Sequence, residues 1–158
     1  MGKEFGLMNI QRQMMVENAK NEVRVCNSIS EKFGLTLSEK EITELVECRA
    51  EALKETERIE FGGGILPKLV YAFCDSPYIN QDNYQSTLAG LQEAFYYFKN
   101  ESWDRLSDDE LIEYMEKVFN GRAGGSVEYL LGTSLTALCR YARNEYNPRD
   151  AKKAGDLF

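Results

Sequence analysis

The segment from Glu57 to Asp75 carries the residues whose types and spacing could bind a small anion. Two glutamates precede a run of three glycines, and a lysine and an aspartate follow it. Glycines let a ligand approach the main chain closely, and a helix that starts after them offers unpaired N–H groups and the positive end of its dipole. The candidate ligand-binding residues are therefore Glu57, Glu60, Gly62, Gly63, Gly64, Lys68 and Asp75.

Known glycine-rich binding patterns do not fit these glycines. The phosphate-binding pattern Gly-x-x-x-x-Gly-Lys-Ser/Thr is absent, and the dinucleotide pattern Gly-x-Gly-x-x-Gly would need a glycine where Pro67 stands. A proline in that place suits the first turn of a helix, where its missing N–H is not needed. A tight turn between two helices is therefore the alternative interpretation of the glycines.

The two glutamates lie on the continuation of a helical face. Extending the apolar face of the preceding helix beyond Leu53 leads to Glu57 and Glu60. Inward-facing carboxylates often have perturbed pKa values and occur at functional sites. Two other interpretations remain open: the helix leaves the core at this point, or Arg49 and Arg58 pair with the glutamates.

Several kinds of catalysis are excluded by residue type. The 158 residues contain no histidine, which removes the Ser-His and Cys-His nucleophile pairs and the common histidine-based metal sites. The four cysteines include no Cys-x-x-Cys pair and lie in apolar surroundings, so they are interpreted as buried thiols rather than metal ligands. We expect no cofactor and no metal, and a binding role is favoured over catalysis.

The charge balance is acidic, with 26 Asp and Glu residues against 19 Lys and Arg residues and a formal net charge of −7. Binding to nucleic acid needs a basic surface, and an anionic membrane repels an acidic protein. Neither is therefore expected as a partner. No secretory signal and no apolar run of about 18–20 residues, the length that spans a bilayer, is found, so a cytoplasmic location is predicted.

The elements that must position the candidate residues are helices. Apolar residues recur at helical spacing in six segments, and Ser38 with Glu41 and Ser107 with Glu110 form capping boxes at the start of two of them. No hairpin pattern is present. The sequence predicts an all-α, compact bundle of five to seven helices with no substantial sheet, with helices at about 16–33, from 39 past 53, and at 66–74, 81–100, 108–120 and 127–142.

One helical domain is expected at 16–147. Residues 1–15 either extend the first helix or form a loose N-terminal arm, and residues 148–158 are expected to be a flexible C-terminal tail. The aromatic residues Tyr96, Tyr97, Phe98 and Trp103 are interpreted as core, with a recognition surface as the alternative.

Three stretches resemble a known family. They are Arg58-Ile59-Glu60-Phe61-Gly62-Gly63-Gly64, the stretch from Tyr71 to Ile79, and the stretch from Ala94 to Ser102. Together they are similar to an uncharacterised protein family of Firmicutes that is described as a domain of unknown function, over about 41–143. The resemblance implies a bacterial cytoplasmic protein, and it assigns no activity or site residue.

Two functional hypotheses follow from these patterns. The first is a helical binding or regulatory module that contacts a protein partner or a second copy of itself. The alternative is a small-ligand site, or an enzyme site without histidine, around Gly62–Gly64.

Overall fold

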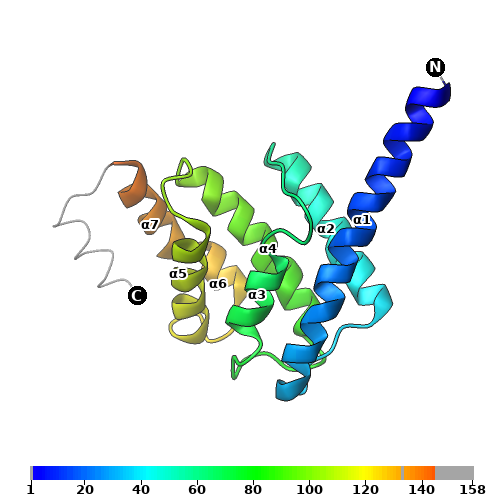
Figure 1. The fold of residues 1–158 in the computed structure, drawn as a ribbon. Coiled ribbons are helices and arrows are strands. Elements are labelled where there is room, and N and C mark those ends of the chain that lie inside the picture. Colours follow the sequence, from blue (N-terminus) through cyan, green and yellow to red (C-terminus); the bar gives the residue numbers. More distant parts are fainter. Residues whose placement is uncertain (1, 133, 145–158) are drawn as a thin grey trace.

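The computed structural model describes residues 2–132 and 134–144. They form helices without strands, which confirms the predicted all-α fold (Figure 1). In chain order the elements are α1 (Gly2–Ser30), the 3₁₀ turn η1 (Glu31–Phe33), α2 (Glu39–Glu55), α3 (Leu66–Phe73), α4 (Tyr84–Glu101), α5 (Asp108–Asn120), α6 (Val127–Gly132) and α7 (Ser134–Arg143).

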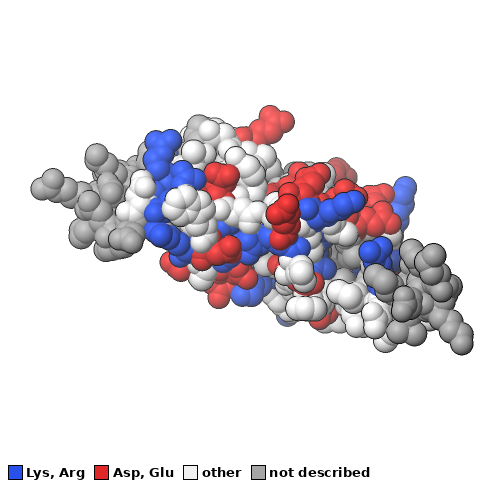
Figure 2. Space-filling model, turned by 90° about the horizontal axis from the view of Figure 1, so that it is seen from above, with Lys and Arg blue, Asp and Glu red and all other residues white. Residues whose placement is uncertain are grey.

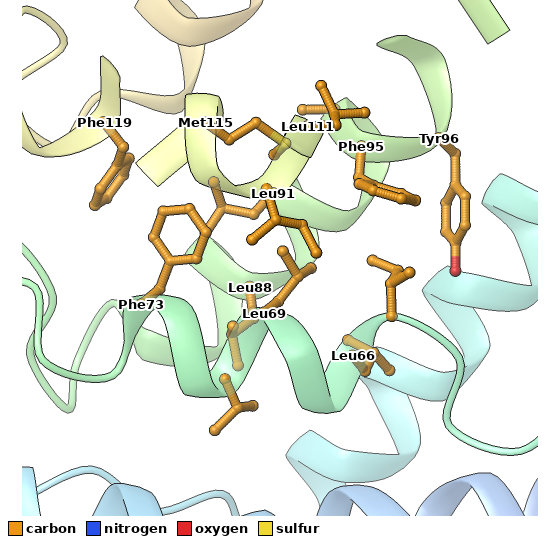
Figure 3. Close-up of a cluster of buried hydrophobic side chains, with 14 of the residues drawn as sticks. Leu66, Leu69, Phe73, Leu88, Leu91, Phe95, Tyr96, Leu111, Met115 and Phe119 are labelled. Carbon is orange, nitrogen blue, oxygen red and sulfur yellow. The ribbon is translucent and has the colours of Figure 1, made fainter. Parts of the chain in front are cut away.

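The core forms around α4. This helix contacts α2, α3, α5, α6 and α7, and its buried side chains include Leu88, Leu91 and Phe95. Figure 3 shows these residues facing the apolar sides of α3 and α5. Phe73 of α3 meets Phe119 of α5 edge to face, with ring centroids 5.4 Å apart. The amphipathic pattern of the fourth predicted helix therefore belongs to a core helix, as expected.

Local sequence signals place the helix starts well. Both capping boxes are present: the Ser38 and Ser107 side chains accept from the main-chain N–H groups of Glu41 and Glu110, and these glutamates accept from the serine N–H groups in return. Pro67 lies in the first turn of α3, and Gly34 follows η1 with φ +77°. The fourth helix begins at Tyr84, three residues later than predicted.

That later start has a local cause. The main-chain N–H of Asn80 donates to Asn83 Oδ1 at 2.9 Å, and the N–H of Asn83 donates to Asn80 Oδ1 at 3.0 Å. This reciprocal pair holds residues 80–83 in a turn. Phe33, at the end of the helix predicted at about 16–33, lies in η1 and is 53% exposed.

The N-terminal part of α1 extends past the rest of the bundle (Figure 1). Of the two alternatives for the first fifteen residues, continuation of the helix is the one that the described residues adopt. Ile10, Met14 and Met15 are exposed there. The predicted C-terminal tail, 148–158, lies outside the described residues. The described helices include none that is long and apolar enough to cross a membrane.

Three of the four cysteines are buried, as the sequence predicted. Cys26, Cys74 and Cys139 are buried free thiols, while Cys48 is half-buried. Burial raises the pKa of the Cys139 thiol to about 12. A raised pKa keeps the thiol protonated and a poor nucleophile, in accordance with the interpretation of this cysteine as a small apolar side chain.

Removing the first capping box should weaken the fold by a defined amount. We expect Ser38→Ala to lower the free energy of unfolding by about 1 kcal/mol, because the Glu41 N–H loses its acceptor. Urea denaturation followed by circular dichroism measures the change. Ser28→Ala is the control, since this exposed serine lies within α1 and caps no helix. An equal loss in the control would contradict the assignment.

Candidate functional site

Glu60 takes part in a cluster of polar side chains at the centre of the candidate site. Arg49 Nε of α2 donates to Glu60 Oε1 at 3.1 Å, and the Tyr96 hydroxyl of α4 donates to the same oxygen. The side chains of Arg49 and Glu60 are 8% and 17% exposed, and Tyr96 is fully buried. The cluster therefore joins α2 and α4 to the connector between α2 and α3.

The connector reaches this cluster by alternating its side chains. Arg58 and Glu60 face the protein, whereas Ile59 and Phe61 face solvent. Alternation of this kind is the period of an extended chain, not of a helix. Glu60 is thus turned inward and paired with Arg49, but not along a helical face, because α2 already ends at Glu55.

Arg58 anchors the other inward position of the connector. Its guanidinium donates to Asp104 through Nη2 at 2.6 Å and to Asn100 Oδ1 at 2.6 Å. Asn100 in turn donates to the main-chain oxygen of Thr56 at 2.8 Å. The hydrogen bonds from Arg58 lower the pKa of Asp104. Of the two arginines considered for Glu57 and Glu60, Arg49 pairs with Glu60 and Arg58 pairs with Asp104.

The glycines pack against carboxylates of the chain itself. The N–H of Gly63 donates to Glu22 of α1, and the N–H of Gly64 donates to the main-chain oxygen of Phe61 at 3.2 Å. Gly62 and Gly64 both have φ +59°, and a Cβ on either one would meet a carboxylate, that of Glu22 or that of Glu60. These contacts match the tight-turn interpretation of the loop.

Three of the predicted site residues lie away from this cluster. Glu57 is exposed, with φ +56° directly after the end of α2. Lys68 is exposed and pairs with Asp109 of α5 at 2.7 Å. Asp75 is exposed beyond the opposite end of α3. The structure thus brings together Glu60 and Gly62–Gly64, and it separates Glu57, Lys68 and Asp75 from them.

A hollow of about 450 Å³ opens beside the cluster, between α1 and α2. Arg49, Glu60 and Gly62 line it together with side chains of both helices. No group of three or more Cys, Asp or Glu residues in the described ranges could hold a metal ion. The charged groups that line the hollow are the cations Arg12, Arg49 and Lys54 and the carboxylates Glu51 and Glu60.

Two residues of the cluster, Glu22 and Tyr96, were missed from sequence, and Arg49 was considered only as an ion-pair partner of the glutamates. Arg49 had a detectable signal, because it occurs among apolar residues on the buried face of α2, where an unpaired charge is costly. Tyr96 belonged to an aromatic run that is divided by the fold: Tyr96 and Phe98 are buried, while Tyr97 and Trp103 are exposed. Glu22 carried no signal, since its partner Gly63 is 41 residues away.

Comparison with known proteins adds the family. The model of a family of unknown function, DUF6323, matches residues 22–148. The chain belongs to this family. The comparison found no match among curated proteins or solved structures. The predicted resemblance to an uncharacterised family is therefore confirmed, and the DUF6323 match includes the whole cluster of Glu22, Arg49, Glu60 and Tyr96.

Gly34 and Gly64 both have a positive φ. Comparing alanine substitutions at these two positions tests the packing of the loop Gly62–Gly64. A Cβ at Gly34, φ +77°, would meet open space, whereas a Cβ at Gly64 would meet the Glu60 carboxylate and lie 2.8 Å from Arg49 Nη2. We expect Gly34→Ala to cost about 1–2 kcal/mol for the left-handed backbone. Gly64→Ala should cost about 3 kcal/mol more, because it also disturbs the buried ion pair.

Urea denaturation of both glycine variants measures the difference. Equal losses in Gly34→Ala and Gly64→Ala would mean that the contact of the loop with Glu60 and Arg49 contributes nothing to stability.

The hydroxyl of Tyr96 predicts a pH dependence. Burial, and then the hydrogen bond to the Glu60 carboxylate, raise the pKa of Tyr96. A raised pKa in the folded protein gives stability that is complete below the unfolded pKa of about 10 and is lost as the pH rises further. We expect the stability difference between wild type and Tyr96→Phe to stay constant below about pH 10 and to shrink above it. Denaturation at pH 7 to 11 tests this, and a constant difference would contradict it.

Proposed function

We propose that the chain is a protein-binding module and that its contact surface is the connector between α2 and α3. The observation that carries this proposal is the exposure of Ile59 and Phe61, at 82% and 80% the largest exposed fractions among the large apolar side chains of residues 10–132 and 135–144. Adjacent exposed apolar groups of this size are a mark of interaction surfaces. Aromatic residues are also enriched where proteins meet.

The two apolar side chains are held in place by their neighbours. Arg58 and Glu60 alternate with them and bind Asp104 and Arg49 respectively. The connector is therefore fixed at two points, although it contains no regular secondary structure between Arg58 and Phe61. A fixed surface loses less conformational entropy when a partner binds than a flexible one does, which favours binding at this place.

The main chain of the connector is also open to a partner. The N–H and C=O groups of Ile59 and Glu60 make no main-chain hydrogen bond with the described residues. An extended segment of a partner could pair with these groups by adding a strand. Its apolar side chains would then cover Ile59 and Phe61.

The charges around the connector indicate which kind of segment fits. Glu51 and Glu55 lie at the C-terminal end of α2 and Glu57 follows it; all three are exposed and form no ion pair with a described residue. The C-terminal end of a helix is its negative pole, so carboxylates are unfavourable there. Basic side chains of a partner would relieve this repulsion. The expected partner segment therefore combines apolar residues with Lys or Arg.

The same charges disfavour the other partners that were considered. A second copy would bring an identical acidic rim against the first, and the net charge of −7 repels it further. Figure 2 shows Asp and Glu side chains adjoining one another over part of the face seen from above. Nucleic acid and anionic membranes are repelled for the same reason, so a basic protein segment is the occupant proposed.

Short synthetic peptides test the proposal. Peptides that alternate two apolar residues with two lysines should bind the full chain, and their counterparts with glutamate in place of lysine should bind at least tenfold more weakly. Fluorescence polarisation measures both, and added salt should weaken the lysine peptides because exposed charges are screened. Equal binding of the lysine and glutamate peptides, or no binding of either, would contradict the proposal.

Two double variants locate the surface. Ile59→Ser with Phe61→Ser should reduce lysine-peptide binding at least tenfold. The control, Val25→Ser with Tyr71→Ser, removes two exposed apolar side chains outside the connector and should leave binding unchanged. Sedimentation velocity on the wild type is run in parallel. A dimer that the connector variant abolishes would assign the surface to a second copy instead and overturn the choice of partner.

A further inference from the structure

The hollow between α1 and α2 has the size and the lining of a ligand site. Its volume of about 450 Å³ lies in the range of roughly 300–1,000 Å³ that is usual for small-molecule sites. Its walls are mainly apolar, and they come from Met15, Val16, Ala19, Val46, Ala50 and Leu53. The apolar lining indicates a ligand whose body is itself apolar.

One end of the hollow carries an incompletely bonded arginine. Arg49 is 6% exposed and lines the hollow. Its Nε binds Glu60, and its Nη2 is buried without a hydrogen-bond partner in the protein. A guanidinium has five N–H donors in a planar fork, and leaving a buried donor unpaired costs about 1–3 kcal/mol. An acceptor from outside the chain would satisfy this group.

The charges of the lining favour a singly charged anion. The lining contains three cations, Arg12, Arg49 and Lys54, and two carboxylates, Glu51 and Glu60. The excess is therefore one positive charge, three minus two, in a chain whose net charge is −7. A carboxylate balances this excess, whereas a doubly charged phosphate would exceed it and be repelled by the two glutamates.

We propose that this hollow binds an amphiphilic carboxylic acid. Its apolar body lies between α1 and α2, and its carboxylate accepts hydrogen bonds from the Arg49 guanidinium, whose Nη2 is closed off from solvent in this structure and turns toward the hollow when the ligand binds. Arg12 and Lys54, which are exposed and form no ion pair with a described residue, attract the anion to the opening. The site does not use Ile59 or Phe61, although Glu60 and Gly62 of the connector line the hollow.

Octanoate is a suitable probe, and isothermal titration calorimetry on the full chain measures its binding. Octylamine has the same tail with a positive head, and acetate has the carboxylate without the tail. We expect octanoate to bind at least tenfold more tightly than either. Equal affinity for octanoate and octylamine would reduce the hollow to a non-selective apolar surface, and no detectable binding of octanoate would overturn the proposal outright.

Two variants at exposed positions of α2, 47 and 50, keep the test independent of folding. Ala50→Trp fills the hollow from its wall and should weaken octanoate binding at least tenfold, whereas Glu47→Trp, at an exposed position outside the lining, should not. Arg49→Lys keeps the charge but loses the fork, and should reduce the preference for octanoate over octylamine. Unchanged binding in Ala50→Trp would place the ligand elsewhere.

The connector variant separates the two proposals. Ile59→Ser with Phe61→Ser should bind octanoate as the wild type does. If the wild-type chain binds octanoate but none of the lysine peptides, only the proposed protein-binding function is wrong. If it binds the lysine peptides but not octanoate, only the proposed ligand site is wrong.

Discussion

The buried ion pair between Arg49 and Glu60 is the interaction on which the rest of this region depends. Two charges leave water to form it, and their desolvation is offset only if the geometry is good and further hydrogen bonds are made. The Tyr96 hydroxyl supplies one such bond on the Glu60 side. The Arg49 side is incomplete, because Nη2 has no acceptor in the protein. The same pair thus stabilises the fold and leaves an unsatisfied donor beside a hollow.

This pair also determines the shape of the connector. Glu60 reaches inward to Arg49, and the main chain at Gly64 packs closely on the pair. A Cβ at Gly64 would meet the Glu60 carboxylate. Ile59, between the inward anchors Arg58 and Glu60, and Phe61, directly after Glu60, consequently face solvent. The exposed apolar surface is therefore a consequence of where the ion pairs are formed. The glycines allow close packing against Glu22 and Glu60.

The two proposed sites differ in charge: the surroundings of the connector are acidic, whereas the lining of the hollow has a small positive excess. Glutamates lie at the C-terminal end of α2, where the helix dipole disfavours them, and they adjoin the connector. The hollow on the α1 side of the same helix has a small positive excess. The two proposed sites therefore lie next to each other, and Glu51 is counted in both. Local departures from favourable electrostatics of this kind are expected at functional sites, where stability alone does not choose the residue.

The sequence by itself determined the helical fold, both capping boxes and the break at the glycines, because helix periodicity, caps and glycine conformation are local properties. It also pointed to Glu60, although through a helix that ends too early. Only the tertiary structure decided which charged residues meet. Arg49 is 11 residues from Glu60 and Tyr96 is 36 residues from it, and Lys68 turns to Asp109 instead of the glycines. Pairing across such distances depends on how helices pack, which no local pattern encodes.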